Sequence, residues 1–373
     1  MKTIMIVMIF IMCYAPVLII FSITPYITRK TESFGVSISE KIYFDPRVKM
    51  IRDSYRNNVL IAGGFIAVLA LLLALFLPMP ANIFALTAGV FVEIGLAFVF
   101  YLGGHKKMKA LKAENNWMGN NKHQVIVVDT EFRQKRVRVS KGWFLLYIIV
   151  ILATLGIGFA MYDKMPDRVP IHYNINGEAD LWVDKSYKVL FAIPGVQSFI
   201  MFLMMFVYWT IGKAKQQVDA SDPERSIEQN RLFRYRWSAF TVFAGLAMVA
   251  MFSLFQLSSI GLVNDTRLLT ILPLLISSSI VAVSIVLSIT TGQGGSRISV
   301  RQGEFKDVIN RDDDKYWKLG VFYYNPDDPA LFVEKRFGIG WTNNFARPMS
   351  WIMIIGFIVI LILIYVVSMM SAK

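Results

Sequence analysis

The sequence has few charged residues and a single cysteine. Of its 373 residues, 17% are Asp, Glu, Lys or Arg, whereas about a quarter is usual in a soluble globular protein. This shortfall excludes a cytosolic enzyme and a disordered chain. The one cysteine, Cys13, has no second cysteine to pair with in the chain, which also excludes a secreted disulfide scaffold.

The usual catalytic and metal-binding patterns are missing too. There is no His-Glu-x-x-His run, no Gly-x-Ser-x-Gly elbow and no cysteine cluster, so the common membrane proteases and hydrolases have no support. The run Gly292-Gln293-Gly294-Gly295 resembles a phosphate-binding turn, but no P-loop lysine follows it, and we interpret it as a flexible helix exit. We therefore expect no enzyme activity, no cofactor and no metal. The histidines His105 and His123 lie in a basic loop, where we expect surface residues.

Long apolar runs dominate what remains, and 55% of the residues are hydrophobic. About 20 apolar residues suffice for a helix to cross the hydrocarbon core of a bilayer. Stretches of that length cover residues 4–24, 59–78, 82–102, 143–162, 189–210, 237–257, 268–289 and 351–370. Because lipid cannot satisfy open backbone groups, such stretches form helices. We predict an all-α integral membrane protein, a bundle of eight transmembrane helices.

The basic residues predict how this bundle is oriented. Of the 39 Lys and Arg residues, 32 lie in loops 25–58, 103–142, 211–236 and 290–350, and seven lie in the termini and the other loops. Since cytoplasmic loops retain Lys and Arg, we place these four loops in the cytoplasm and both termini outside a plasma membrane. The excess charge predicts attraction to anionic membrane lipids. Because it is spread over four loops, it does not favour nucleic-acid binding. We interpret the first run as an uncleaved span rather than a signal peptide.

These assignments divide the chain into five parts. They are residues 1–142 with three helices and basic loops, 143–212 with two helices around the outer loop 163–188, 213–291 with two more helices, the aromatic loop 292–350, and the eighth helix in 351–373. The pairs Asp45-Pro46 and Asp222-Pro223 are typical helix starts, with an N-cap followed by a first-turn proline.

The cytoplasmic loops also contain strand-like alternation of apolar and polar residues. It occurs at residues 34–39, 125–129, 137–140 and 297–301, and the aromatic loop adds a turn at 325–329 between two more apolar runs. We therefore predict a small β-containing cytoplasmic assembly built from loops. The aromatic part at 316–345 is consistent with a hairpin at the inner headgroups or with a structural lid over the bundle.

The outer loop 163–188 is the most distinctive segment. Pro166 and Pro170 favour an extended arm, and Asn176-Gly177 is the residue pair most typical of a tight hairpin turn. Folding back at this turn would bring together polar and aromatic residues on its two sides, which are His172, Tyr173, Asn174, Glu178, Asp180, Trp182 and Asp184.

The pattern Pro-Asp-x-Val-Pro-x-His-Tyr-Asn-x-x-Gly-x-x-Asp, which begins at Pro166, resembles the membrane domain of the SdpI-type bacterial immunity proteins. Residues 291–297 and the aromatic loop from 317 to 341 also resemble that superfamily, most of whose members are uncharacterised. The resemblance implies a bacterial plasma-membrane protein that protects against a toxic extracellular peptide and signals its presence to a cytoplasmic regulator. This chain, with eight expected spans and a long aromatic loop, is larger than the compact immunity protein.

Three interpretations of the outer loop remain open. As a receptor element, it would present His172, Tyr173, Asn174, Asp180 and Trp182 to an extracellular peptide or a lipid headgroup, since aromatic rings beside polar anchors form binding hot spots. As a metal site it would lack ligands, because zinc takes three or four and no second histidine lies outside. As a structural turn, held by Pro166, Pro170, Asn176 and Gly177, it would simply join two helices.

Glu93 is the one charged residue within an expected span. A carboxylate at the centre of a membrane helix costs about 2.5 to 3.5 kcal/mol, so its environment must offset this cost. It could couple to protons, contact a polar substrate, or be a protonated acid bonded to Ser278 or another hydroxyl. Pro194-Gly195 and Pro273 could bend their helices and open a cavity.

Three functions therefore remain under consideration. The first is a non-enzymatic sensor or immunity protein that recognises a ligand through loop 163–188. The second is a small-molecule or lipid transporter that uses Glu93 and kinked helices. The third is a membrane enzyme without a recognisable motif.

Overall fold

The computed structural model describes residues 2–78, 80–117, 124–125, 136–173, 179–301, 309–310 and 312–371. Its long helices are α1 (Lys2–Ile27), α3 (Pro46–Phe76), α4 (Ala81–Glu114), α5 (Phe144–Ala160), α7 (Ala192–Lys213), α8 (Pro223–Ser259), α9 (Thr266–Thr291) and α10 (Pro348–Ser371). The short helices are α2 (Glu40–Tyr43) and α6 (Tyr187–Leu190), with 3₁₀ turns η1 (Lys141–Trp143), η2 (Tyr162–Lys164), η3 (Gln293–Gly295) and η4 (Asp314–Tyr316).

Within these ranges, seven helices are long and apolar enough to cross a membrane, which confirms a multispanning helical protein. They are α1, α3, α4, α5, α7, α8 and α9, and the apolar spans of α5, α7 and α9 include a few flanking residues. The predicted eighth span coincides with α10. Its apolar part, Pro348–Leu363, is shorter than the seven helices that are long enough to cross a membrane. An eight-helix transmembrane bundle therefore stays a prediction.

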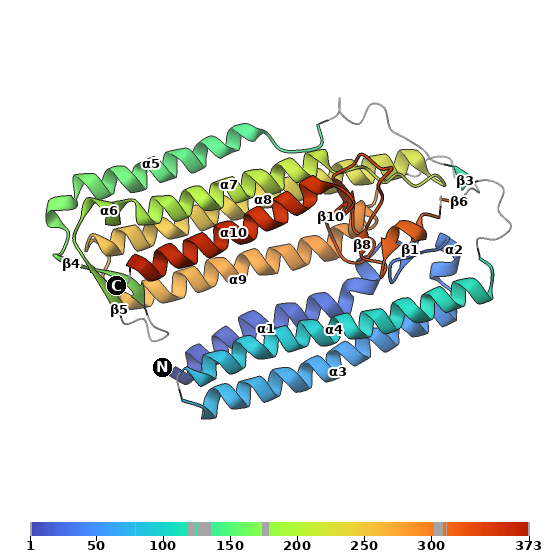
Figure 1. The fold of residues 1–373 in the computed structure, drawn as a ribbon, viewed down its shortest axis with the longest axis horizontal. Helices are drawn as coiled ribbons and strands as arrows, with labels where there is room; N and C mark the ends of the chain where they lie inside the picture. The colour runs from blue at the N-terminus through green and yellow to red at the C-terminus, as the bar shows by residue number, and fades with distance from the viewer. Residues whose placement is uncertain are drawn as a thin grey trace.

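The helices form two groups, which Figure 1 shows one above the other. In the first group α1, α3 and α4 pack together, and in the second α8 packs against α5, α7 and α9. The groups meet where α1 contacts α9. Both termini and the hairpin after α5 lie at one end of the bundle, and the loops with β1, β6, β8 and β10 lie at the other (Figure 1).

Local sequence explains where α3 and α8 begin, as predicted. The Asp45 carboxylate accepts a hydrogen bond of 2.8 Å from the backbone N–H of Arg47, and Asp222 accepts one of 3.2 Å from that of Arg225. In both helices proline occupies the first position, where its missing N–H is not needed.

Pro194 also lies in a first helical turn, that of α7, so it breaks no hydrogen bond inside the span. Pro273 lies inside α9.

The strands form five separate two-stranded sheets among the described residues, and not one combined sheet. The pairs are β1 (Glu32–Ser33) with β2 (Val36–Ser37), β3 (Gln124–Val125) with β6 (Ile309–Asn310), β4 (Arg168–Tyr173) with β5 (Ala179–Asp184), β7 (Trp317–Lys318) with β8 (Phe322–Tyr323), and β9 (Phe332–Glu334) with β10 (Trp341–Asn343). The pair β3 and β6 is parallel and joins two different loops, whereas the others are antiparallel.

Several predicted strands differ from those observed. Residues 34–39 form no single strand, because Phe34 and Gly35 both have positive φ and turn the chain between β1 and β2. Residues 137–140 and 297–301 contain no strand, and of the segment 125–129 only Val125 is described, in β3.

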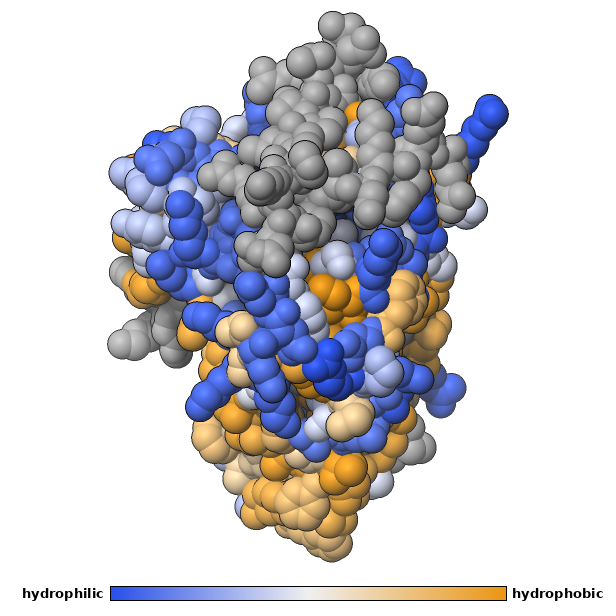
Figure 2. Space-filling model, turned by 90° about the vertical axis from the view of Figure 1, so that its right-hand side faces the viewer, coloured by the Kyte–Doolittle hydropathy of each residue, from blue (hydrophilic) through white to orange (hydrophobic). Residues whose placement is uncertain are grey.

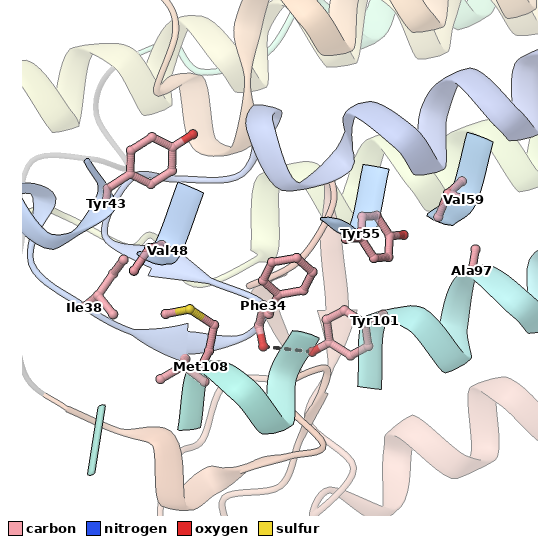
Figure 3. Packing of buried hydrophobic residues seen from close by; sticks show 10 residues of the cluster. Phe34, Ile38, Tyr43, Val48, Tyr55, Val59, Ala97, Tyr101 and Met108 are labelled. Carbon is pink, nitrogen blue, oxygen red and sulfur yellow. Dashed lines mark hydrogen bonds between the residues drawn. The ribbon is translucent and has the colours of Figure 1, made fainter. Parts of the chain in front are cut away.

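A buried aromatic cluster fixes the β1–β2 turn between α3 and α4 (Figure 3). The Phe34 ring lies 5.4 Å from that of Tyr55 and 5.5 Å from that of Phe337. The Tyr101 hydroxyl donates to the carbonyl oxygens of Phe34, at 3.3 Å, and of Leu319, at 2.9 Å. The cluster thus connects α3 and α4 to the aromatic loop, which is far away in the sequence.

His105 belongs to the same region. Its Nδ1 lies 2.8 Å from the Phe34 carbonyl oxygen, and its ring stacks on Tyr101. The expectation of a plain surface histidine is therefore wrong for His105, and His123 lies outside the described residues.

Candidate functional site

The hairpin predicted for residues 163–188 is present and joins α5 to α7. Its strands β4 and β5 pair antiparallel from Arg168 opposite Asp184 to Tyr173 opposite Ala179. The register shifts on either side of His172, which marks a bulge in β4. The turn residues Asn174, Asn176 and Gly177 lie outside the described part of the chain.

The backbone brings the predicted site residues to neighbouring positions. His172 lies opposite Leu181, between Asp180 and Trp182 on the other strand, and Trp182 itself lies opposite Pro170. The Trp182 side chain is 43% exposed, and its indole N–H donates to the Ala179 carbonyl oxygen at 3.3 Å. The hairpin therefore carries an exposed indole, and its backbone places His172 and Asp180 at nearby positions along the paired strands.

The base of the hairpin is packed against the end of α8. Val169, Met165 and Leu190 form a buried apolar cluster with Ile260, the residue that follows α8. Lys185 adds polar contacts, since its backbone N–H donates to the Asp167 carbonyl oxygen at 2.8 Å and its ammonium to that of Met165 at 3.1 Å. The hairpin is therefore rooted on α8 and is not a loose loop.

Beneath the hairpin, polar side chains link α5, α7 and α8 inside the apolar region. The Gln197 amide donates to the Val249 carbonyl oxygen at 2.8 Å and to the Ser253 hydroxyl at 2.9 Å. The Ser253 and Thr154 hydroxyls lie 2.8 Å apart. Gln256 is buried one turn further, and neither polar atom of its side chain has a hydrogen-bond partner among the described residues. Sequence reasoning missed these residues, although an amide within an apolar run is a signal that could have identified them.

A buried ionic network occupies the opposite end of the molecule. Glu334, at the end of β9, is ion-paired with Arg29 and Arg234, with 3.2 Å between its Oε1 and Arg234 Nη2. The Asn230 amide donates to the same Oε1 at 2.6 Å. Arg29 follows α1, and Asn230 and Arg234 belong to α8, so one carboxylate joins both helical groups to the aromatic loop.

Arg336 forms the second half of this ionic network. Its guanidinium pairs with Asp313 and Asp314, and donates to the Gly35 carbonyl oxygen at 3.0 Å. Lys112 of α4 completes the group, 2.6 Å from Asp314 Oδ2. Burial acts to raise the pKa of Asp314, but Arg336 and Lys112 outweigh it and hold that pKa at about 2.

Glu32 is also buried in this network, 3.9 Å from Arg336 Nε. Burial raises the pKa of its carboxyl to about 7, although Arg336, Arg29 and a hydrogen bond from Gln217 act in the opposite direction. Sequence reasoning missed this network, because its members come from segments far apart in the chain and none forms a local motif.

Glu93 lies in the first helical group, where its side chain packs against α3. It is 2% exposed, and neither carboxylate oxygen has a hydrogen-bond partner among the described residues. A Cβ at Gly63 would lie 3.2 Å from Glu93 Oε1, so this glycine makes room for the carboxylate. The proposed partner Ser278 is wrong, because neither Glu93 oxygen bonds to it and its hydroxyl donates within its own helix, to the Leu274 carbonyl oxygen at 2.7 Å.

Two segments of the chain match families of unknown function. Residues 149–197 match a family described as a domain of unknown function (DUF1648), and residues 326–351 match a family of unknown function (DUF5808). The first match covers most of α5, strands β4 and β5, α6 and the start of α7, so the sequence of this segment is similar to that of a wider family. No curated protein and no solved structure matches the chain.

Within the described ranges, no three His, Cys, Asp or Glu residues lie close enough to hold a metal ion.

Proposed function

We propose that this multispanning membrane protein is a non-enzymatic sensor or immunity protein. It recognises an extracellular peptide or lipid-like ligand at the β4–β5 hairpin, through His172, Tyr173, Asn174, Asp180 and Trp182, and transmits binding to the loops at the other end.

The observation that carries this proposal is the pair of attachments of α8. One end of this continuous 37-residue helix is followed by Ile260, which is buried against Val169 and Leu190 at the hairpin base. Its other end carries Asn230 and Arg234, which bond Glu334 in the ionic network. A packed helix moves as a unit, so a shift at the hairpin base changes the geometry around Glu334.

The charge distribution supports the orientation that this proposal needs. Both termini and the hairpin lie at one end of the bundle (Figure 1), and the loops with 32 of the 39 basic residues lead to the other. Because cytoplasmic loops retain Lys and Arg, the end with the basic loops would face the cytoplasm and the hairpin end would face outside. Labelling with a membrane-impermeant thiol reagent tests this in a Cys13→Ser background. We expect Trp182→Cys to react in intact cells. Tyr324→Cys replaces a side chain that is exposed at the other end, and we expect it to react only after the cells are lysed.

Hydrogen–deuterium exchange tests the transmission itself. Val169→Ala removes buried apolar contacts at the hairpin base. We expect faster exchange in residues 230–234 and 332–336, which lie at least 61 positions from residue 169 in the sequence. Ile171→Ala, on the same strand but at an exposed side chain, is the matched control and should leave both segments unchanged. Equal exchange in the two variants would contradict transmission through α8.

Recognition is tested by survival of cells challenged with the peptide fraction of spent bacterial culture medium. We expect His172→Ala and Trp182→Ala to lose protection at unchanged protein content, while Leu262→Ala, an exposed side chain in the other outer loop, retains it. Protection that survives both hairpin substitutions would count against recognition at this site.

Glu93 supports a second candidate, a small-molecule or lipid transporter. Its buried carboxyl has no hydrogen-bond partner among the described residues, which is costly in lipid and typical of transport pathways. We expect Glu93→Gln to abolish uptake or export in sealed vesicles while leaving the hairpin-dependent response intact. Loss of the response with unchanged transport would instead favour the sensor.

A further inference from the structure

A polar cleft lies beside the ionic network, at the end opposite the hairpin. The cleft is lined by residues that follow α1, by residues before α8, by the first turns of α8 and by the glycine-rich turn after α9. Its volume is about 630 Å³, including the part open to solvent. Figure 2 faces this end and shows hydrophilic residues gathered over it.

Three residues that line this cleft each have a buried side-chain atom with no hydrogen-bond partner among the described residues. The atoms are Arg29 Nε, Arg225 Nε and Ser296 Oγ. All three carry a hydrogen to donate, and two belong to cationic guanidinium groups. Arg29 is 8% exposed, so its unpaired N–H is held away from bulk water. Leaving such donors unpaired is unfavourable, and a ligand that supplies acceptor oxygens would satisfy them.

The acidic residues of the cleft are already engaged by the protein. Glu40 accepts from the Lys30 ammonium at 3.0 Å, and Asp222 accepts from the Arg225 backbone N–H as the N-cap of α8. Asp219 accepts from the hydroxyl of Ser221 at 2.7 Å. The unpaired Nε groups of Arg29 and Arg225 can only donate, and the Ser296 hydroxyl can donate as well as accept.

The glycine-rich turn holds Arg29 in this position. Gly294 has a φ of +60°, and a Cβ there would lie 2.0 Å from an Arg29 guanidinium nitrogen, so only glycine lets the arginine lie against the turn. Gly295, with φ of +85°, approaches the Gln229 carbonyl of α8 in the same way. The turn that the sequence presents as a helix exit thus forms one wall of the cleft.

We propose that this cleft binds a phosphate group, held by Arg29, Arg225 and Ser296. Guanidinium groups bond phosphate oxygens with geometry that suits both partners, and the dipole at the start of α8 favours an anion nearby. The phosphate can belong to a soluble compound or to the headgroup of an anionic lipid. Since Arg29 also pairs with Glu334, the bound phosphate competes with that carboxylate and acts on the ionic network from a second site.

Binding is tested with the full chain in lipid nanodiscs. The soluble probe is pyrophosphate, titrated into protein in purely zwitterionic nanodiscs and followed calorimetrically. The lipid probe is phosphatidylglycerol, whose retention relative to phosphatidylcholine is measured by native mass spectrometry. Binding of pyrophosphate assigns a soluble source, preferential retention of phosphatidylglycerol assigns a lipid source, and either result upholds the site.

Two variants locate the site, with a matched control on the same helix. We expect Arg225→Gln to weaken binding of the effective probe about tenfold or more, because hydrogen bonds from a charged donor are lost. Ser296→Ala removes a hydroxyl that has no partner within the described ranges, so it should fold normally and weaken binding about threefold or more. Arg231→Gln, which loses a guanidinium paired with Glu228 outside the cleft, should bind like the unaltered protein.

Two results would overturn the assignment. One is that the unaltered protein neither binds pyrophosphate nor retains phosphatidylglycerol in preference to phosphatidylcholine. The other is that Ser296→Ala and Arg225→Gln bind no more weakly than Arg231→Gln, which would indicate nonspecific attraction to the basic surface. Neither experiment depends on the hairpin, so the sensor proposal can fail while this site stands.

Discussion

Glu334 should contribute more to stability than any exposed carboxylate of the protein, because it lies between two guanidinium groups. Its side chain and that of Arg234 are fully buried, and that of Arg29 is 10% exposed. Replacing Glu334 by Gln keeps the shape and one acceptor oxygen but removes the negative charge. Two buried cations then lose their shared counterion, which costs about 3 to 5 kcal/mol for a buried pair.

Glu40 provides the matched control. It pairs with Lys30 at 3.0 Å, but both side chains are at least 40% exposed. Solvent screens such a pair, so Glu40→Gln should cost at most about 1 kcal/mol. Both substitutions are Glu to Gln, so the comparison isolates the effect of burial.

The assay is equilibrium unfolding in mild-detergent micelles, with a denaturing detergent as the titrant and helical circular dichroism as the signal. We expect the midpoint to fall much further for Glu334→Gln than for Glu40→Gln. If Glu334→Gln fails to fold, Asn230→Ala removes one 2.6 Å hydrogen bond to the same carboxylate and should cost about 1.5 to 3 kcal/mol. A loss below about 1 kcal/mol in both buried variants would refute our account of this network.

Three further predictions use the same unfolding assay. Burial raises the pKa of the Glu32 carboxyl to about 7, so the folded protein binds the carboxyl proton more tightly than the unfolded chain does. The contribution of Glu32 to stability should therefore fall by up to about 3 kcal/mol as the pH rises from about 4.5 to 7. Glu32→Gln should remove this pH dependence. Gly295→Ala should destabilise the protein by more than about 1 kcal/mol, since its φ is +85° and the new Cβ would lie 2.2 Å from the Gln229 carbonyl oxygen. Gln197→Leu should cost about 1 kcal/mol by removing interhelical hydrogen bonds, whereas Gln256→Leu, which replaces unpaired polar atoms, should be neutral or stabilising.

The sequence predicted those features that depend on local chemistry. Apolar length located the helices, and the Asp-Pro pairs at residues 45 and 222 located the starts of α3 and α8. The β4–β5 hairpin followed from its two prolines and the Asn-Gly pair, and β4 and β5 flank that pair as expected. In each case the deciding residues are neighbours along the chain.

Features that depend on distant residues could not be predicted in this way. Alternation at residues 34–39 suggested one strand, but Phe34 takes a positive φ because its ring is buried among Tyr55, Tyr101 and Phe337. Ser278 was chosen as a partner of Glu93 because it is a hydroxyl in an apolar span, yet it bonds within its own helix. The residues around Glu334 are separated by up to 305 positions, so no periodicity relates them.

The lengths of α3, α4 and α8 have a consequence for how the protein sits in a bilayer. These helices contain 31, 34 and 37 residues, so at 1.5 Å per residue they measure about 47 to 56 Å, whereas the hydrocarbon layer is about 30 Å thick. A good part of each helix must therefore stand clear of the lipid tails, even when tilted. Lys112 lies near the end of α4 and Arg234 in the first third of α8, so we expect the ionic network that they join to lie outside the lipid tails, where charged groups are less costly.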